Sequence, residues 1–441
     1  MTKLYLDFDS FFASAEQHFN PALRGKPVGV VPLDVRHTGC IAISREAKRA
    51  GVPSGASVSE ARAIVPEMIF ILARPDAYVR LHHRILAVIE GCLPIEKVRS
   101  IDELVCNLVA SEAEQGGELA HRIKAALLNA FGPTLTCSIG IGPSELLAKI
   151  GAEMHKPDGL VILRESELPG SIAHLKLSDI PGISKGMSAR LEKAGITDVP
   201  ALWKLGAKEA RGLWGSIEGE RFWNALHGLP YERPVSEKRM FGHSRMLSFD
   251  WRTPERVHDC ARQLSLSAVR RLRRTEFKAT QLTLSVRGGG SRTDNARRSD
   301  QQRWSTEMQF EAMRDDASTL EQLAAAIVQF RRDVRFKPRS VTVLLHGLVD
   351  AAPAQADLFS QPGLNDQRAA ILVRQEKRER LSGAMDAIRA KHGPASASWG
   401  VCDEIPGGFV GSKIAFGRIP DLGDFNEAPS KDEATHFCVV A

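Results

Sequence analysis

Acidic residues follow the apolar part of a predicted strand near the N-terminus, where a buried strand would normally continue with apolar residues. In the stretch Leu4 to Gln17, two apolar residues precede Asp7 and Asp9, which are spaced by two. Because side chains two positions apart lie on one face of a strand, we expect both carboxylates to project from that face at its tip. A helix then begins, with Phe11 and Phe12 in its first turn. A single D-x-D near an N-terminus is also typical of a capped helix start, so the pattern alone leaves both interpretations open.

A second acidic pair lies further along the chain. In Val98 to Leu108, Asp102 and Glu103 separate two apolar half-strands, as a hairpin turn would. A turn allows adjacent carboxylates to converge instead of pointing to opposite faces. If these carboxylates also meet that of Asp7, the three repel one another strongly. Magnesium is the usual reason for such a cluster, since it binds a few carboxylates together with water and phosphate oxygens.

Taken together, D-F-D-S-F-F-A-S-A-E and S-I-D-E resemble the two metal-binding motifs of the Y-family translesion DNA polymerases. The similarity continues through further motifs in the same order. These are G-K-P-V at 25–28, E-A-K-R-A-G-V at 46–52, C-S-I-G-I-G-P at 137–143 and L-A-K-I-G-A-E-M-H-K-P-D-G at 147–159. The resemblance covers roughly the first 350 residues, and an ordered series of motifs is far more specific than any one of them.

The resemblance implies an α+β multidomain fold shaped like a right hand. It has a palm of antiparallel sheet backed by helices on one face, small fingers, a helical thumb with a helix-hairpin-helix, and a βαββαβ little finger. The palm would occupy residues 1–20 and 76–165, the fingers 21–75, the thumb 166–235, the little finger 236–350, and a C-terminal tail 351–441. The sequence pattern agrees, with helices expected at 44–50, 58–64, 75–92, 114–131 and 146–155, and strands at 25–31, 38–43, 135–141 and 160–163.

The resemblance also implies template-directed, low-fidelity translesion DNA synthesis, in which a nucleotidyl group passes from a deoxynucleoside triphosphate to a primer 3′-hydroxyl. Asp7, Asp102 and Glu103 would be catalytic. Two Mg²⁺ ions would be bridged by Asp7 and Asp102, with Glu103 and the Phe8 carbonyl completing their shells. The alternative functions are a catalytically inactive scaffold, which would lack these carboxylates, and a nucleotide cyclase, which the thumb, basic domain and clamp peptide disfavour.

Residues expected to contact the incoming nucleotide are Phe11, Phe12, Arg45, Lys48, Ser100 and Lys156. In the family, an aromatic hydroxyl and an arginine normally face the triphosphate where this chain has Arg45 and Lys48, so positive charge is kept with altered geometry. Lys156 would contact the β- and γ-phosphates, or else complement a helix dipole. Phe12 would lie beneath the sugar. Because only one of two consecutive rings is expected to face the interior, the alternative is that Phe12 belongs to the core.

This chain differs from most members of the family at two positions after S-I-D-E. Most relatives carry Ala and, three residues later, Asp, whereas this chain has Leu104 and Asn107. The loss of one negative charge puts in doubt any role of that Asp in tuning the neighbouring carboxylates.

Several segments are expected to bind DNA. The chain carries a net charge of +6, but residues 236–340 hold 22 Lys and Arg against 13 Asp and Glu, a local +9 that indicates a polyanion-binding domain. The P-G-I-S-K-G turn of the thumb exposes backbone N–H groups to a phosphate, unless it is a plain structural turn. The arginine run at 270–274 either contacts phosphate or forms an exposed helix face. The residues named for DNA contact are Gly182, Ser184, Lys185, Gly186, Arg245, Arg270, Arg271, Arg273 and Arg274.

In the tail, Q-A-D-L-F resembles the peptide by which bacterial polymerases dock on the sliding clamp, with Gln355, Leu358 and Phe359 as the contacting residues. A basic helix at 369–392 and a strand at 411–420 are expected without an assigned function. Seven cysteines without a C-x-x-C pair, and no apolar run long enough for a membrane span, favour a cytoplasmic protein. We expect a monomeric catalytic unit.

Overall fold

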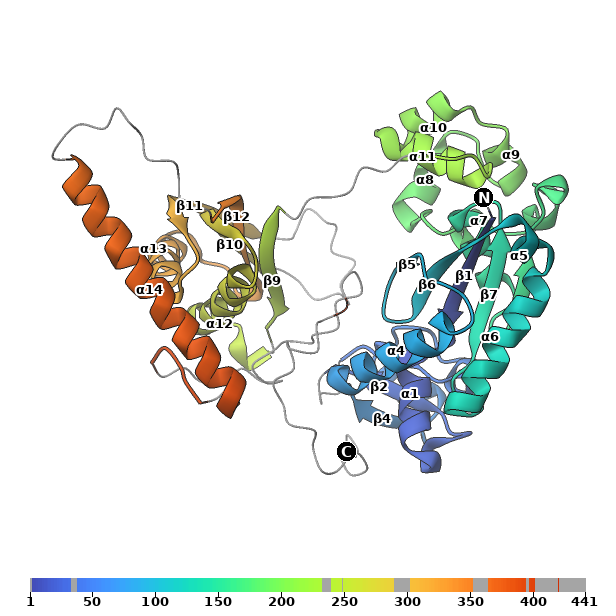
Figure 1. Ribbon diagram of the computed structural model, residues 1–441, viewed down its shortest axis with the longest axis horizontal. Helices are drawn as coiled ribbons and strands as arrows, with labels where there is room; N and C mark the ends of the chain where they lie inside the picture. The colour runs from blue at the N-terminus through green and yellow to red at the C-terminus, as the bar shows by residue number, and fades with distance from the viewer. Residues whose placement is uncertain are drawn as a thin grey trace. The chain divides into compact units, whose positions relative to one another are not determined.

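The computed structural model describes residues 2–32, 38–231, 239–247, 249–288, 302–351, 364–393, 396–400 and 419, with the side chains of 364–372 excluded. The chain divides into two compact units (Figure 1), one holding the described residues up to 231 and the other those from 239 to 400. Among the described residues, no helix is both long enough and apolar enough to cross a membrane.

The first unit is built around a five-stranded sheet with the order β5-β6-β1-β7-β8. Its strands are β1 (Thr2–Phe8), β5 (Lys97–Val98), β6 (Glu103–Leu108), β7 (Cys137–Gly142) and β8 (Leu160–Ile162). The central β1 pairs antiparallel with both β6 and β7, whereas β7 and β8 are parallel. The sheet is therefore mixed and not entirely antiparallel as expected, because helix α7 (Glu145–Met154) crosses over between β7 and β8.

Helices cover both faces of this sheet, whereas the sequence led us to expect one. Leu4, Leu6 and Phe8 of β1 pack into the main core with α1 (Phe11–Phe19), α4 (Pro75–Glu90) and α6 (Gly116–Phe131). On the opposite face, Tyr5 packs with Ala148 and Ala152 of α7. A side chain at Gly140 of β7 would place its Cβ 1.9 Å from the Ala148 carbonyl oxygen, so glycine allows α7 to lie directly on the sheet. Helix α5 (Ala110–Glu114) precedes α6.

The fingers region has its own small sheet, ordered β3-β2-β4. Strands β2 (Val28–Val31) and β4 (Ile69–Leu72) are parallel, and β3 (Ala42–Ile43) is shorter than predicted. Sequence analysis missed β4. Helices α2 (Arg45–Arg49) and α3 (Val58–Ile64) lie where they were predicted, each capped by a serine, and a 3-10 helix spans Pro21–Leu23.

The thumb region is helical, with α8 (Lys185–Lys193), α9 (Val199–Trp203), α10 (Ala207–Trp214) and α11 (Ile217–Leu226). The first helix of the predicted helix-hairpin-helix is only a 3-10 turn, Leu177–Asp179. Further 3-10 turns span Glu165–Glu167 and Gly170–Ile172. Gly182 in the hairpin has a φ of +95°, a conformation that glycine adopts without strain.

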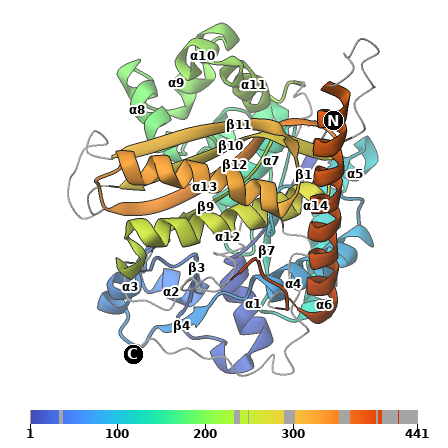
Figure 2. The same cartoon turned by 90° about the vertical axis from the view of Figure 1, so that its left-hand side faces the viewer.

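The second unit confirms the βαββαβ order. It runs β9 (Met240–Met246), α12 (Pro254–Arg273), β10 (Phe277–Gly288), β11 (Arg303–Met313), α13 (Asp316–Asp333) and β12 (Pro338–Asp350), with a 3-10 turn at Phe249–Trp251. The strands form an antiparallel sheet in the order β11-β10-β12-β9. Figure 2 shows α12 and α13 on one face of this sheet, where they enclose the core of the unit.

Helix α14 (Leu364–His392) begins earlier than predicted and packs against α13 of the same unit. Its contacts are mainly polar. Asp386 pairs with Arg273 of α12 at 2.8 Å and with Arg270 at 3.4 Å, and Glu379 pairs with Lys278 and Arg314. The Ser382 hydroxyl accepts the N–H of Asp316, which itself pairs with Arg273 at 2.6 Å. An ion-pair network therefore attaches α14 to the second unit.

Candidate active site

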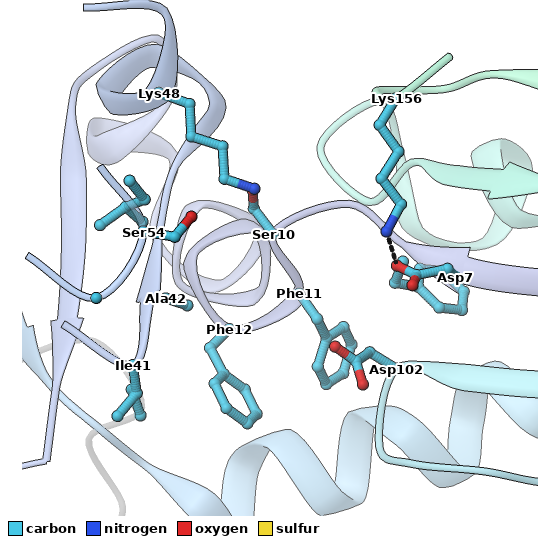
Figure 3. A pocket seen from close by; sticks show the side chains of 13 residues that line it. Asp7, Ser10, Phe11, Phe12, Ile41, Ala42, Lys48, Ser54, Asp102 and Lys156 are labelled. Carbon is cyan, nitrogen blue, oxygen red and sulfur yellow. Dashed lines mark ion pairs between the residues drawn. The ribbon is translucent and has the colours of Figure 1, made fainter. Parts of the chain in front are cut away.

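The pairing of β1 with β6 sets the position of the predicted catalytic residues. Asp7 lies directly opposite Glu103 in the strand register, and the Phe8 N–H donates to the Asp102 carbonyl at 2.9 Å. Asp7 and Asp102 both line a pocket between the central strand and the fingers region (Figure 3). The pocket residues are Asp7, Phe8, Ser10, Phe11, Phe12, Ile41, Ala42, Ile43, Lys48, Ser54, Gly55, Asp102 and Lys156.

A group of carboxylates gathers beside this pocket. Oxygen atoms of Asp7, Glu103 and Glu153 lie within 4.8 Å of one another. Sequence analysis missed Glu153, although it stands three residues before Lys156 and one helical turn after Lys149 in a motif that had been singled out. Tyr5 and Asp7 face α7. Lys149 and Glu153 lie one turn apart on α7, so both of their side chains reach the same cluster.

Burial dominates the electrostatics of the two pocket carboxylates. It raises the pKa of Asp7 to about 8, although nearby Lys156 acts in the opposite direction. Lys156 Nζ lies 2.8 Å from Asp7 Oδ1 and 2.8 Å from Glu153 Oε1. Burial also raises the pKa of Asp102. Crowded carboxylate oxygens beside a backbone carbonyl are the donor set that a hard divalent cation prefers, so these residues fit Mg²⁺.

Glu103 is held by groups that the sequence did not suggest. Lys149 Nζ of α7 donates to Glu103 Oε1 at 2.5 Å and to the Tyr5 hydroxyl at 3.1 Å. Burial opposes ionisation of Glu103, but the hydrogen bond and charge of Lys149, together with hydrogen bonds to Asp7 and Tyr5, outweigh it and lower the pKa of this carboxyl overall. The Ser100 hydroxyl donates to Asp102 Oδ1 at 2.5 Å and lies 3.5 Å from Glu103 Oε2. Ser100 therefore orients carboxylates, and it is not among the residues lining the pocket.

Phe11 and Phe12 both line the pocket and both belong to the core, with only 3% and 5% of their surfaces exposed. The expectation that only one ring could face the interior was wrong, because the first turn of α1 lies on the boundary between core and pocket. The Phe12 ring stacks on Tyr78 of α4, with ring centroids 4.7 Å apart.

Two lysines extend toward the pocket from opposite sides, Lys48 from α2 and Lys156 from the segment just after α7 (Figure 3). Arg45 does not line the pocket. It donates to the Thr136 hydroxyl at 3.1 Å and to the Thr134 carbonyl at 3.4 Å, which connects α2 to the segment before β7. Of the two predicted fingers cations, only Lys48 reaches the pocket.

Asp9 does not share the pocket with Asp7, contrary to the expectation from their spacing. It is 4% exposed and accepts hydrogen bonds from Thr136, Ser138 and the N–H of Asp158. The chain leaves the extended conformation after β1, and Ser10 adopts a φ of 52°. The period of two therefore ends at Phe8.

The two positions after S-I-D-E at which this chain differs from most of the family lie within the sheet. Leu104 is buried in the main core, and the Asn107 side chain accepts a bond from Lys3 at 2.5 Å. Asn107 contributes nothing to the pocket lining.

The predicted DNA-binding arginines are mostly engaged inside the second unit. Arg270 and Arg273 join the ion-pair network of α14, an alternative that sequence analysis did not consider. Arg271 donates to the Gly242 carbonyl at 2.8 Å, and Arg245 is 9% exposed, with burial lowering its pKa. In the run, Arg274 is the exposed member.

In the thumb, Ser184 is the N-terminal cap position of α8, and Lys185 and Gly186 form its exposed first turn. Gln355, Leu358 and Phe359 lie outside the described residues, as does the predicted strand at 411–420 except for residue 419, so these predictions are untested.

Known proteins match most of the chain. A family model described as the impB/mucB/samB family matches residues 6–153, and one for the C-terminal domain of that family matches residues 238–358. A DNA polymerase IV of Moorella thermoacetica is 30% identical over 404 residues, covering 88% of this chain and 93% of the relative. A DNA polymerase IV of Streptomyces coelicolor is 30% identical over 377 residues, covering 82% of this chain and 73% of the relative.

Solved structures agree on the fold. A Y-family DNA polymerase chimera aligns with a TM-score of 0.64 at 23% identity, covering 79% of this chain and all of that one. An insertion ternary complex of Dbh DNA polymerase aligns with a TM-score of 0.52 at 24% identity over the same share.

Proposed function

Because the chain belongs to the Y-family of DNA polymerases, the impB/mucB/samB family, we propose that it carries out template-directed translesion DNA synthesis. In this reaction the primer 3′-oxygen forms a bond to the α-phosphorus of a deoxynucleoside triphosphate. The bond from that phosphorus to the β-phosphate oxygen breaks, and pyrophosphate leaves. The observation that carries the proposal is the pocket in which Asp7 and Asp102 lie beside two lysines, with Glu103 opposite Asp7 in the strand register.

The carboxylates of Asp7, Asp102 and Glu103, together with the Phe8 carbonyl, would hold two Mg²⁺ ions. When bound, the ions supply charge neutralisation at the reacting phosphate and lower the pKa of the attacking hydroxyl. The raised pKa of Asp7 supports this role, because a buried carboxylate with crowded neighbours is stabilised by a cation. Glu153 lies close enough to add negative charge to the same cluster.

The protein's own side chains position the nucleotide. Lys48 and Lys156 would bind the triphosphate from its two sides, each as a point charge. The ring of Phe12 would lie against the sugar and exclude a 2′-hydroxyl, since a ring offers no hydrogen-bond partner to that group. Lys149 and Ser100 hold Glu103 and Asp102 in orientation.

DNA would be bound through its backbone, by the turn from Gly182 to Gly186 and by Arg274 in the basic second unit. The tail peptide with Gln355, Leu358 and Phe359 would dock on a sliding clamp. The inactive scaffold is not supported, since the chain retains Asp7, Asp102 and Glu103.

Primer extension tests the proposal. Wild-type protein should add deoxynucleotides to a primer on undamaged and damaged templates. Asp102→Ala should abolish addition while leaving duplex affinity nearly unchanged, because it removes a carboxylate from the pocket but no DNA contact. Glu16→Ala is a matched control, since Glu16 is a buried carboxylate of the same unit that bonds to Arg74 and Tyr78 away from the pocket. Extension by Asp102→Ala within about tenfold of wild type would refute the assignment.

A further inference from the structure

Asp9 is the polar centre of the turn between β1 and α1, and hydrogen bonds engage both its backbone groups and both carboxylate oxygens. Its N–H donates to the Thr136 carbonyl at 3.0 Å, and its carbonyl accepts the Ser14 hydroxyl at 2.7 Å. Oδ1 accepts the Ser138 hydroxyl at 2.8 Å. Oδ2 accepts both the Thr136 hydroxyl and the Asp158 N–H, each at 2.8 Å. A buried carboxylate with this many donors fixes the segments that supply them.

One of these segments carries Lys156. Asp158 stands two residues after Lys156 and has a φ of 58°, a conformation that non-glycine residues adopt only when their surroundings hold them. Asp9 holds this turn through the Asp158 N–H, and Lys124 holds the other side, 2.6 Å from the Asp158 carbonyl. The hydrogen bond from the Asp158 N–H to Asp9 therefore fixes the backbone turn that follows Lys156.

A second connection leads toward Lys48. The Thr136 hydroxyl that donates to Asp9 accepts a bond from Arg45 Nη1 at 3.1 Å. Arg45 is the first residue of α2, and Lys48 lies one turn later on the same short helix. Hydrogen bonds thus join Asp9 to Arg45, on the same short helix as Lys48, and to Asp158, two residues after Lys156.

We propose that Asp9 is a positioning residue for the triphosphate. It fixes Lys156 through the Asp158 turn and Lys48 through Thr136 and Arg45, so that the two ammonium groups are held at a set separation before a nucleotide arrives. This inference rests on the proposed function, in which both lysines bind the triphosphate. Holding charged donors in place lowers the cost of ordering them on binding.

Single-nucleotide insertion kinetics tests the inference. Asp9→Ala should raise KM for the nucleotide about tenfold, with a smaller change in kcat and unchanged duplex affinity. Thr136→Val keeps the shape of the side chain and removes the hydroxyl that bonds both Asp9 and Arg45, but it leaves the bond from the Asp158 N–H to Asp9, so its KM should rise by less. Glu16→Ala, the matched buried carboxylate, should lower thermal stability and leave KM within about twofold of wild type.

A variant in which both pocket lysines are replaced separates a positioning role of Asp9 from a purely stabilising one. When Lys48 and Lys156 are both alanine, Asp9→Ala should add no further rise in KM, because the residues it positions are gone. A persisting rise would overturn the inference, as would a folded Asp9→Ala protein with the wild-type KM. If Asp9→Ala does not fold, an unchanged KM for Thr136→Val overturns it instead.

Lys156→Ala distinguishes failure of the proposed nucleotide role of Lys156 from failure of the inference about Asp9. If that variant leaves KM unchanged, the proposed nucleotide role of Lys156 fails and the inference falls with it. If Lys156→Ala raises KM and Asp9→Ala does not, the inference alone fails.

Discussion

Lys156 Nζ lies 2.8 Å from Asp7 Oδ1, so an ammonium group contacts a carboxylate that we propose as a metal ligand. The two cations would compete for one carboxylate. Burial holds the pKa of Asp7 at about 8 even with Lys156 beside it, so at neutral pH a proton also competes for this carboxylate.

Metal affinity should therefore depend on pH. The folded pKa of Asp7 is raised above its ordinary value of 3.8, so this group stabilises the folded protein fully below about pH 4, and that stability is lost as the pH rises through about 8. Because a metal ion needs the ionised form, affinity for Mn²⁺ should rise with pH toward 8 and level off above it. A binding titration at a series of pH values measures this.

Lys156→Met provides the control for that titration. Removing a neighbouring positive charge raises the pKa of Asp7 further, so the plateau in Mn²⁺ affinity should move to higher pH. A flat profile between pH 6 and 8 in wild-type protein, or an unmoved plateau in the variant, would contradict the assignment.

Phe12→Ala should raise ribonucleotide incorporation at least about tenfold relative to the matching deoxynucleotide. The substitution should also lower the free energy of unfolding, because Phe12 stacks on Tyr78 in the core. Truncating a buried phenylalanine typically costs about 3–5 kcal/mol of stability. Phe11→Ala tests whether the effect is specific to Phe12, since Phe11 is also buried and lines the same pocket. Insertion kinetics with both sugars decides the matter. A folded variant with wild-type discrimination would leave Phe12 with a core role only.

Asp386→Ala should loosen α14. Asp386 is a shared partner of Arg270 and Arg273, and its removal takes one carboxylate from the network while Asp316 still pairs with Arg273, at a cost on the order of 1–3 kcal/mol. Hydrogen exchange should show faster exchange in α14 than in α12 or α13. Glu376→Ala changes a carboxylate on the exposed side of the same helix, where its pair with Arg380 is solvent-accessible, and should have little effect. Equal protection of α14 in both variants would argue against the network.

Replacing Gln355, Leu358 and Phe359 together by alanine should leave distributive primer extension unchanged and remove stimulation by the sliding clamp. The reason is that the peptide follows β12, the last strand of the second unit, in the sequence, whereas the described residues that line the pocket come from the first unit. Extension rates with and without a loaded clamp measure the effect. Clamp stimulation that survives the triple substitution would exclude this peptide as the docking site.

The sequence alone predicted most of the helices and strands, and its motifs singled out Asp7, Asp102 and Glu103 as the proposed metal ligands. Alternation along β1 places Leu4, Leu6 and Phe8 on one face and Tyr5 and Asp7 on the other, and the strand and helix order of the second unit is equally visible from periodicity. These features are local, because each depends on residues within one or two turns or strands of one another.

The tertiary structure decided what each side chain contacts. Asp7 and Asp9 look equivalent in the sequence, but β1 ends between them, so one faces the pocket and the other binds Thr136, Ser138 and Asp158. The sequence predicts that Arg273 contacts DNA, but in the structure Arg273 pairs with Asp386 of α14, which lies far along the chain. Partners separated by more than a hundred residues are brought together only by strand register and helix packing, which no local pattern encodes.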